Sequence, residues 1–173
     1  MIEIPRPEPS EFAPYYAPYV ARVPPGKLLD VLRRQGTDFA VTIRAVPEGR
    51  ASFRYEPGKW SVKQVVGHIS DAERIFTYRA LCFSRGEQAP LPGFDENAYA
   101  PASGADLRPI VELAAEFEAV RNATLALFGG MSESMLTARG TANGNPFTVR
   151  AIAYIVAGHT FHHAAVLNER YLK

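Results

Sequence analysis

Cysteine is almost absent from this sequence, since Cys82 is the only one among 173 residues. A single cysteine cannot form an intramolecular disulfide, and it excludes a zinc site built from several thiolates. Long hydrophobic runs are also absent: the longest uncharged apolar stretch, around residues 151–158, is far shorter than the roughly 20 residues that a membrane helix needs. The first residues combine Glu3 with several prolines and do not resemble a signal peptide. We therefore expect a protein of the reduced cytoplasm that does not span a membrane.

An excess of charge of either sign is missing as well. Nineteen basic residues stand against eighteen acidic ones, which gives a formal net charge of +1. Nucleic acids and anionic membranes are bound by clustered positive charge, so neither is an expected partner. The length and the 47% hydrophobic fraction are typical of one globular domain. We expect residues 1–173 to form that domain, with residues 1–25 as an N-terminal arm packed on it.

Four segments carry apolar residues at the three-to-four spacing of an amphipathic helix. The first covers residues 28–46 and ends before Pro47. The second, residues 62–83, has the clearest start signal, because Ser61 and Gln64 form a capping-box pattern. Both segments are therefore predicted to be helices.

The third and fourth segments lie in the second half of the chain. The third begins near Asp106, with Pro109 in its first turn, and ends at the glycine pair 129–130. The fourth begins either at Asn145-Pro146 or at Thr148 and carries a long apolar face. Each is long enough to be a full bundle helix.

Four helices of roughly 20 residues predict an all-α four-helix bundle. Stretches near residues 52–55 and 136–141 could be extended, but no convincing β-hairpin repeat appears. The link between the second and third helices, residues 86–105, is long, and such loops are usually functional or disordered. We predict a crossover or lid beside the functional site, in which Asp95 and Glu96 either approach a metal or face water.

The sequence has only four histidines, and three of them lie close together near its end. His159 and His163 are one helical turn apart, so their side chains emerge on the same face. His68 borders the apolar stripe of the second helix. Three imidazoles and an open fourth position are typical of a catalytic zinc site. The spacing also permits hydrogen-bonded core histidines, and it leaves open whether His162 replaces His163 as a ligand, because pairs three residues apart also bind metals.

Two of these histidines follow a glycine: Gly67 precedes His68, and Gly158 precedes His159. Glycine costs roughly 1 kcal/mol of helix propensity. We expect each glycine to leave room for a close helix approach or for an ion with its ligands.

Several motifs occur in a fixed order along nearly the whole chain. They are YEPGKWSVKQVVGHI at residues 55–69, DAER at 71–74, RGE at 85–87, LPGFD at 91–95, GHTFHH at 158–163 and ERY at 169–171. With these motifs the sequence resembles the DinB/YfiT-like family of metal-binding bundle proteins.

The resemblance implies a four-helix bundle with a crossover connection and a three-histidine site for one divalent metal ion. The ligands fall on His68, His159 and His163, which leaves His162 a packing or supporting role. Zinc or nickel is the expected ion, although neutral imidazole suits several metals and the sequence does not choose among them. Family members include transferases that use low-molecular-weight thiols, proteins regarded as metal-dependent hydrolases, and many without a known activity, so function transfers less cleanly than fold.

Other polar residues give weaker signals. Asp71, one turn after His68, could act as a general base or orient an imidazole, and a solvated helix residue fits equally well. Glu73 and Arg74 are expected to form an exposed helix pair or an inter-helix salt bridge, and Cys82 a small core residue. The sequence contains no Ser-His-Asp order, phosphate loop or dinucleotide motif.

The leading hypothesis is a metal-dependent enzyme that acts on a small molecule, by thiol transfer or by hydrolysis. Both reactions need the same three ligands and one open position, so the sequence does not decide between them. The competing hypothesis is a non-catalytic, stress-associated protein that binds metal or a small ligand, favoured by the lack of an unambiguous general base. We also expect a homodimer, because the aromatic-rich arm, residues 1–25, must pack on its own bundle or on a neighbour's.

Overall fold

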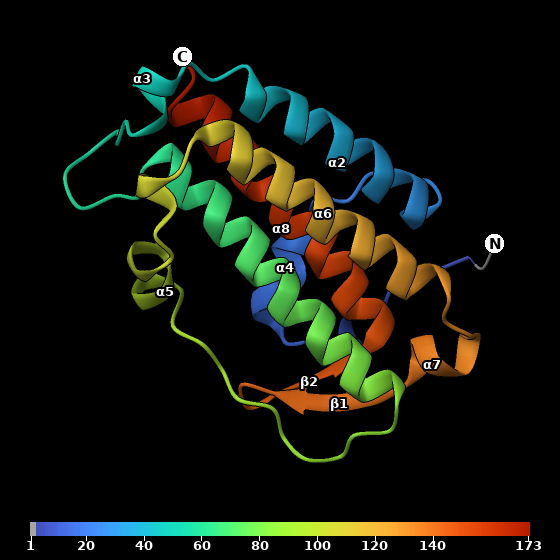
Figure 1. Cartoon of the computed structure of the whole chain (residues 1–173). Coiled ribbons are helices and arrows are strands. Elements are labelled where there is room, and N and C mark those ends of the chain that lie inside the picture. The colour runs from blue at the N-terminus through green and yellow to red at the C-terminus, as the bar shows by residue number, and fades with distance from the viewer. Residues whose placement is uncertain (1–2) are drawn as a thin grey trace.

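Four long helices form the body of the computed structural model of the protein, which describes residues 3–173 (Figure 1). They are α2 (Leu28–Arg44), α4 (Val62–Ser84), α6 (Ile110–Gly129) and α8 (Val149–Arg170). The predicted capping box is present, because the Ser61 hydroxyl accepts from the Gln64 backbone at 3.0 Å and the Gln64 side chain accepts from the Ser61 backbone at 3.2 Å. The prediction of an all-α four-helix bundle is confirmed.

The order in which the four long helices pack around the bundle differs from their order along the chain. Helix α6 packs against α2 and α4, while α4 also packs against α8 and α8 against α2. Figure 1 shows α4 and α6 running in the same direction, opposite to α2 and α8. Because α4 and α6 are parallel neighbours, the chain must return along the bundle between them, as the predicted crossover requires.

The crossover is more ordered than the sequence indicated. It contains α5 (Glu96–Ala102) and the 3-10 helix η3 (Ala105–Leu107). Asp95 caps α5 by accepting from the backbone N–H of Asn97 at 2.9 Å, so this acid has a structural role. Leu91 donates its N–H to the carbonyl of Thr141 at 2.9 Å, which ties the crossover to the segment before α8.

The start of α6 differs from the prediction. The expected helix from Asp106 is interrupted, because Arg108 is extended (φ −110°, ψ 147°) and α6 begins only at Ile110 with Pro109 as its N-cap. A proline disfavours the helical conformation of the residue before it. Pro109 therefore separates η3 from α6 instead of lying in the first turn of one continuous helix.

A single β-hairpin precedes α8, and its first strand overlaps the stretch 136–141 that could be extended. Strands β1 (Arg139–Ala142) and β2 (Asn145–Thr148) pair antiparallel. They are joined by Asn143 and Gly144, which both have positive φ (50° and 70°), as a type I′ turn requires. Because β2 includes Asn145-Pro146, the fourth helix takes the later of its two predicted starts, with Thr148 as N-cap. Residues 52–55 form no strand.

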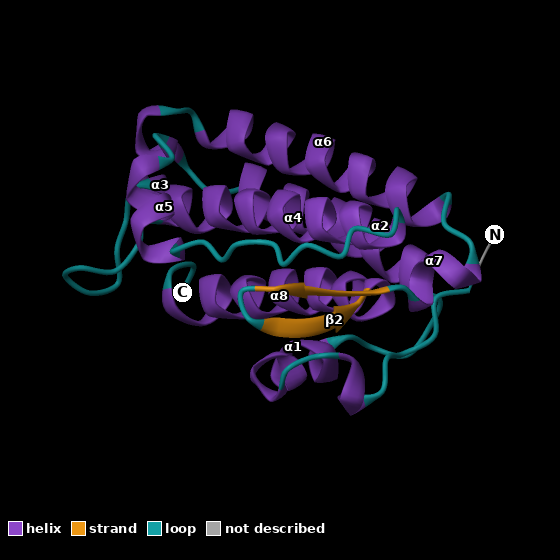
Figure 2. Ribbon diagram, turned by 90° about the horizontal axis from the view of Figure 1, so that it is seen from below, coloured by secondary structure: helices purple, strands orange, loops and turns teal. Residues whose placement is uncertain are grey.

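The N-terminal arm packs on α8 of its own chain, on the side where the hairpin also lies (Figure 2). It comprises η1 (Pro9–Glu11), η2 (Pro14–Tyr16) and α1 (Ala17–Arg22), while Met1 and Ile2 lie outside the described residues. A Cβ at Gly158 would lie 2.0 Å from the Tyr19 carbonyl oxygen, so glycine permits this close approach. The homodimer stays a prediction, and the arm does not require a second chain to cover it.

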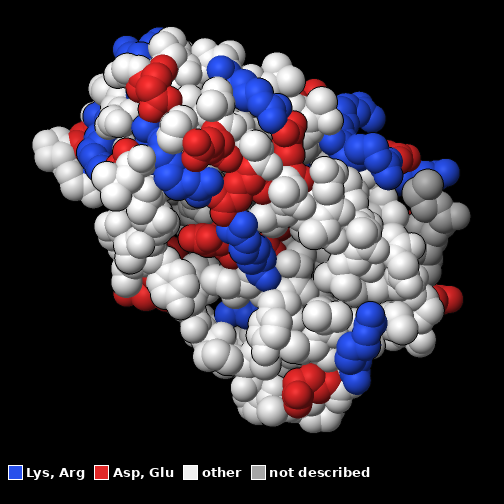
Figure 3. All heavy atoms as spheres, in the orientation of Figure 1, with Lys and Arg blue, Asp and Glu red and all other residues white. Residues whose placement is uncertain are grey.

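Two short helices complete the fold: α3 (Glu48–Ala51) and α7 (Glu133–Thr137). Within residues 3–173, no helix combines the length and apolar character that crossing a membrane demands. The face in Figure 3 carries acidic and basic side chains next to one another, as the small net charge indicates.

The buried core has two apolar parts, separated by a polar layer to which each long helix contributes. Arg121 of α6 donates from Nε and Nη2 to both carboxylate oxygens of Glu73 on α4, each at 2.8 Å. Its remaining N–H groups reach the Leu32 carbonyl and Gln35 Oε1 at 2.9 Å and Thr160 Oγ1 at 3.1 Å. Glu73 is thus a buried inter-helix partner, and the exposed alternative for it was wrong.

Candidate metal centre

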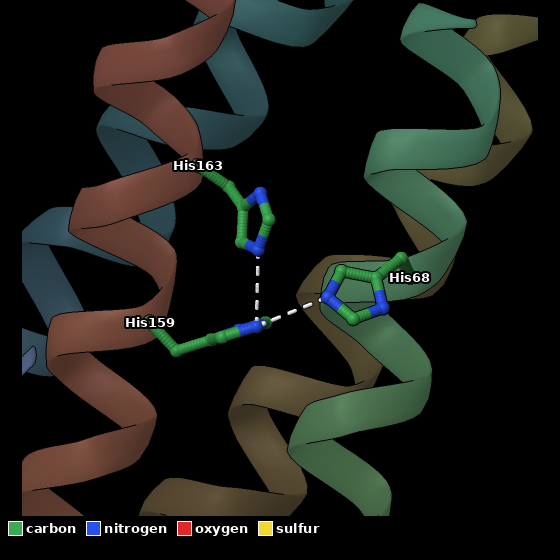
Figure 4. A group of neighbouring side chains, drawn as sticks. All are labelled: His68, His159 and His163. Carbon is green, nitrogen blue, oxygen red and sulfur yellow. Dashed lines mark hydrogen bonds between the residues drawn. The ribbon is translucent and has the colours of Figure 1, made fainter. Parts of the chain in front are cut away.

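Three of the four histidines converge between α4 and α8 (Figure 4). Nε2 of His159 lies 3.1 Å from Nε2 of His68 and 3.1 Å from Nε2 of His163. A ligand atom from each ring lies within 4.8 Å of the other two. The structure therefore brings together the three histidines that the resemblance selected.

The two short contacts cannot both be ordinary hydrogen bonds. A neutral imidazole nitrogen presents either one N–H or one lone pair in the ring plane, yet Nε2 of His159 faces two neighbours. A divalent ion among the three nitrogens would satisfy all of them at once. Zinc–nitrogen bonds of about 2.0 to 2.1 Å in a tetrahedron place ligand nitrogens about 3.3 Å apart, close to the 3.1 Å found here. The donor set therefore fits a divalent metal ion.

Burial keeps these imidazoles neutral. It lowers the pKa of His68 to about 4 and, together with the nearby rings of His68 and His162, that of His163 to about 3. Burial likewise lowers the pKa of His159 well below its usual value, and the neighbouring histidines add to the effect. Neutral rings with free lone pairs are the form that binds metals, so the site is prepared for a cation at neutral pH.

His162 lies outside the cluster. Its ring packs edge-on against Tyr19 of α1, with ring centroids 5.5 Å apart. Burial lowers the pKa of His162, and the positive charge of Arg22 adds to this. The alternative in which His162 replaces His163 as a metal ligand is therefore not supported by the structure.

A cavity of about 410 Å³ opens onto the three histidines. Its walls are largely aromatic and come from the N-terminal arm, from α4 and from the segment before it: Tyr15, Tyr16, Tyr19, Trp60 and Phe76. The Trp60 ring stacks at a tilt on His68, with centroids 4.7 Å apart. The volume is within the range of small-molecule sites.

The remaining lining residues are mostly polar, and sequence reasoning missed most of them. Two charged groups face the cavity, Glu96 of α5 and Arg79 of α4, beside the amides of Asn97, Asn143 and Asn145. Glu96 belonged to the predicted loop beside the site. Nothing in the sequence marked Arg79 as a residue of the cavity, because a charged residue on a helix ordinarily faces water.

Asp71, the acid suggested for catalysis, is not brought to the cluster. Its carboxylate lies 3.4 Å from Nη1 of Arg74, and it is not among the residues that line the cavity. Burial raises the pKa of Asp71, and Glu116 adds to this against the opposing effect of Arg74. A catalytic role for Asp71 stays a prediction.

Comparison with known proteins agrees with this fold. YfiT from Bacillus subtilis, described as a probable metal-dependent hydrolase with an unusual four-helix bundle topology, superimposes with a TM-score of 0.74 over 83% of each chain at 18% sequence identity. At that identity the likeness establishes the fold alone. Among curated proteins none matches. A family model described as the DinB superfamily matches residues 32–167, well over half of the sequence, and so this chain belongs to the DinB superfamily.

Proposed function

We propose that this protein is a metal-dependent hydrolase of small molecules, with one divalent ion, zinc or nickel, bound by His68, His159 and His163. The observation that carries the proposal is the convergence at a cavity of three neutral imidazoles, of which His68 and His159 are buried and His163 is half-buried. A site with three protein ligands and space beside it is the arrangement of catalytic metal centres, whereas structural sites are closed by a fourth ligand. This favours an enzyme over the non-catalytic alternative.

The ion, when bound, supplies Lewis acidity that polarises a substrate carbonyl and makes water more acidic. The protein contributes a shaped, largely aromatic cavity that limits water around the substrate. Glu96 is the only carboxylate that lines the cavity within residues 3–173. We therefore assign Glu96, ahead of Asp71, the role of accepting a proton from the attacking water.

Hydrolysis is preferred to thiol transfer because YfiT, which shares the fold, is described as a probable metal-dependent hydrolase, and because the cavity offers a carboxylate to act as base. Transfer from a low-molecular-weight thiol would use the same three histidines. It would not need Glu96, because a thiolate stabilised by the ion is already the nucleophile. The Glu96→Gln variant therefore separates the two reactions.

Metal content is the first test. The unmodified protein and His162→Ala should each carry about one divalent ion per chain by elemental analysis, and His163→Ala should carry almost none. Circular dichroism should show all three equally folded, because the imidazoles contribute little to the apolar core. Loss of metal from His162→Ala with retention in His163→Ala would refute the ligand assignment.

Activity is the second test. Metal-loaded protein should hydrolyse members of an ester and amide panel, and Glu96→Gln should lower the rate by about 10²- to 10⁴-fold while metal content stays unchanged. Turnover seen only with a low-molecular-weight thiol and an electrophile, and insensitive to Glu96→Gln, would establish the transferase instead. Stoichiometric metal without turnover in either panel would support the non-catalytic alternative.

A further inference from the structure

Arg79 is a buried cation without a counter-ion. The residue is only 3% exposed, yet it lines the cavity that contains the three histidines. Its Nη2 donates to the carbonyl oxygen of Pro92 at 2.9 Å, its one side-chain hydrogen bond to a protein acceptor within the described residues. The guanidinium carbon lies 5.5 Å from the centre of the Phe76 ring.

Other buried cations in the molecule are neutralised. Arg121 is paired with Glu73 at 2.8 Å, and the Lys63 ammonium is paired with Glu48. No carboxylate of residues 3–173 lies within 4.0 Å of the Arg79 guanidinium. A buried charge that lacks a partner is costly, and burial lowers the pKa of Arg79, although a guanidinium stays protonated in proteins. This cost points to a ligand that supplies the missing charge.

The free N–H groups of Arg79 face the cavity. In the described part of the chain, every fully buried side-chain nitrogen or oxygen has a hydrogen-bond partner. Arg79 has five N–H groups and one protein acceptor. The nitrogens without an acceptor must therefore reach open space, and the space beside this residue is the cavity.

The position of Arg79 relative to the histidines follows from α4. His68, Ala72, Phe76 and Arg79 line the same cavity from one helix. Eleven residues separate His68 from Arg79, which is roughly 16 Å along the axis. Both side chains lean toward the helix N-terminus, and the longer Arg79 side chain does so further than His68, so we estimate a span on the order of 10 Å between guanidinium and imidazole.

We propose that Arg79 binds a carboxylate of the substrate, at the end of the cavity opposite the metal ligands. The substrate class is then a small monocarboxylate whose reacting group lies on the order of 10 Å from its carboxylate. A carboxylate balances the single charge of one guanidinium and offers two coplanar oxygens to its N–H groups, whereas a dianionic phosphate carries a second negative charge that Arg79 does not neutralise. The location of the reacting group rests on the proposed function, but the carboxylate site does not.

Binding of benzoate, benzamide and phenyl phosphate, measured by calorimetry, tests the site without catalysis. The unmodified protein should bind benzoate about 10- to 100-fold more tightly than benzamide, its uncharged counterpart, and more tightly than phenyl phosphate. Arg79→Gln should abolish the preference for benzoate, and Arg79→Lys should retain part of it. Arg74→Gln is the matched control, because Arg74 lies on the same helix, pairs with Asp71 and Glu116, and does not line the cavity.

His163→Ala separates this proposal from the proposed metal site. This variant should lose metal but keep the preference for benzoate. If benzoate binding is lost in His163→Ala and retained in Arg79→Gln, the carboxylate is on the metal and the inference is wrong. Equal affinity for benzoate and benzamide in the unmodified protein also overturns it, whether or not Arg79→Gln folds, and tighter binding of phenyl phosphate overturns the carboxylate assignment.

Discussion

Two polar clusters are buried within the bundle, and they differ in how their polar atoms are satisfied. In the Arg121–Glu73 cluster, all five N–H groups of the guanidinium donate to protein acceptors on three other helices. In the histidine cluster, by contrast, the Nε2 atoms face only one another and the cavity. The adjacent residues His159 and Thr160 belong to different clusters. A buried polar group whose hydrogen bonds are all made by the protein supports the fold, whereas one that lacks protein partners is available to a ligand.

The largest effect on stability is expected from Arg121→Met, which removes the central cation of the Arg121–Glu73 cluster. The change leaves the Glu73 carboxylate buried without a partner, so we expect the free energy of unfolding to fall by about 3 to 5 kcal/mol. Urea denaturation of the metal-free protein measures this. The double variant Glu73→Met/Arg121→Met should recover most of the loss, because no charge then remains buried. A double variant as unstable as Arg121→Met would mean that the network is not a self-contained ion pair.

Glu11 is a second buried polar group whose hydrogen bonds are made by the protein, and we expect it to make stability depend on pH. Burial alone would raise the pKa of this carboxyl, but hydrogen bonds from Arg150, Thr148 and the Glu8 backbone lower it from 4.5 to about 2. Since the folded pKa lies below the unfolded one, the unfolded chain binds more protons between these values. Stability should therefore be fully present above about pH 4.5 and decrease by up to about 3 kcal/mol as pH falls to 2.

Glu11→Gln provides the control for that titration. The variant should be less stable at pH 7 and should lose less stability on acidification than the unmodified protein, as followed by thermal denaturation at each pH. If stability falls equally with pH in the two proteins, Glu11 does not cause the loss of stability at acidic pH.

The smallest effect is expected at Asp71. Its contact with Arg74 is partly solvated, and such pairs are worth about 0 to 1 kcal/mol. Asp71→Asn should therefore change the midpoint of urea denaturation only slightly and leave both metal content and turnover unchanged. A fall in turnover of about 10²-fold or more, with metal retained, would instead support the catalytic role suggested by its position after His68.

Much of the fold followed from local patterns in the sequence. The apolar periodicity and the Ser61–Gln64 cap predicted the main helices, since these signals act over a few residues. Spacing could not separate His162 from His163, because residues three and four apart both lie near His159 on a helix. The resemblance made that choice, and the packing of His162 against Tyr19 agrees with it.

Other features depended on contacts that no local pattern encodes. Arg121 is 48 positions from Glu73, and each read alone is an ordinary surface charge of a helix. Arg79 was missed for the same reason, since only the folded crossover, which supplies Pro92, and the cavity make it buried. The hairpin was missed although Asn143-Gly144 is a strong turn signal, because the strands beside it have only four residues each.

The docking of the N-terminal arm on α8 has a consequence for how the chain acquires its shape during synthesis. Glu11 is 137 positions from Thr148, and His68 is 91 positions from His159. Contacts between residues so far apart in the sequence form slowly, because the entropic cost of closing a long loop precedes the stabilisation that the contacts provide. During synthesis, α1, α2, α4 and α6 leave the ribosome before α8 has been made. Until then the aromatic N-terminal arm has no helix to pack on. Closure of the bundle, docking of the arm and assembly of the histidines therefore all require α8 to be complete.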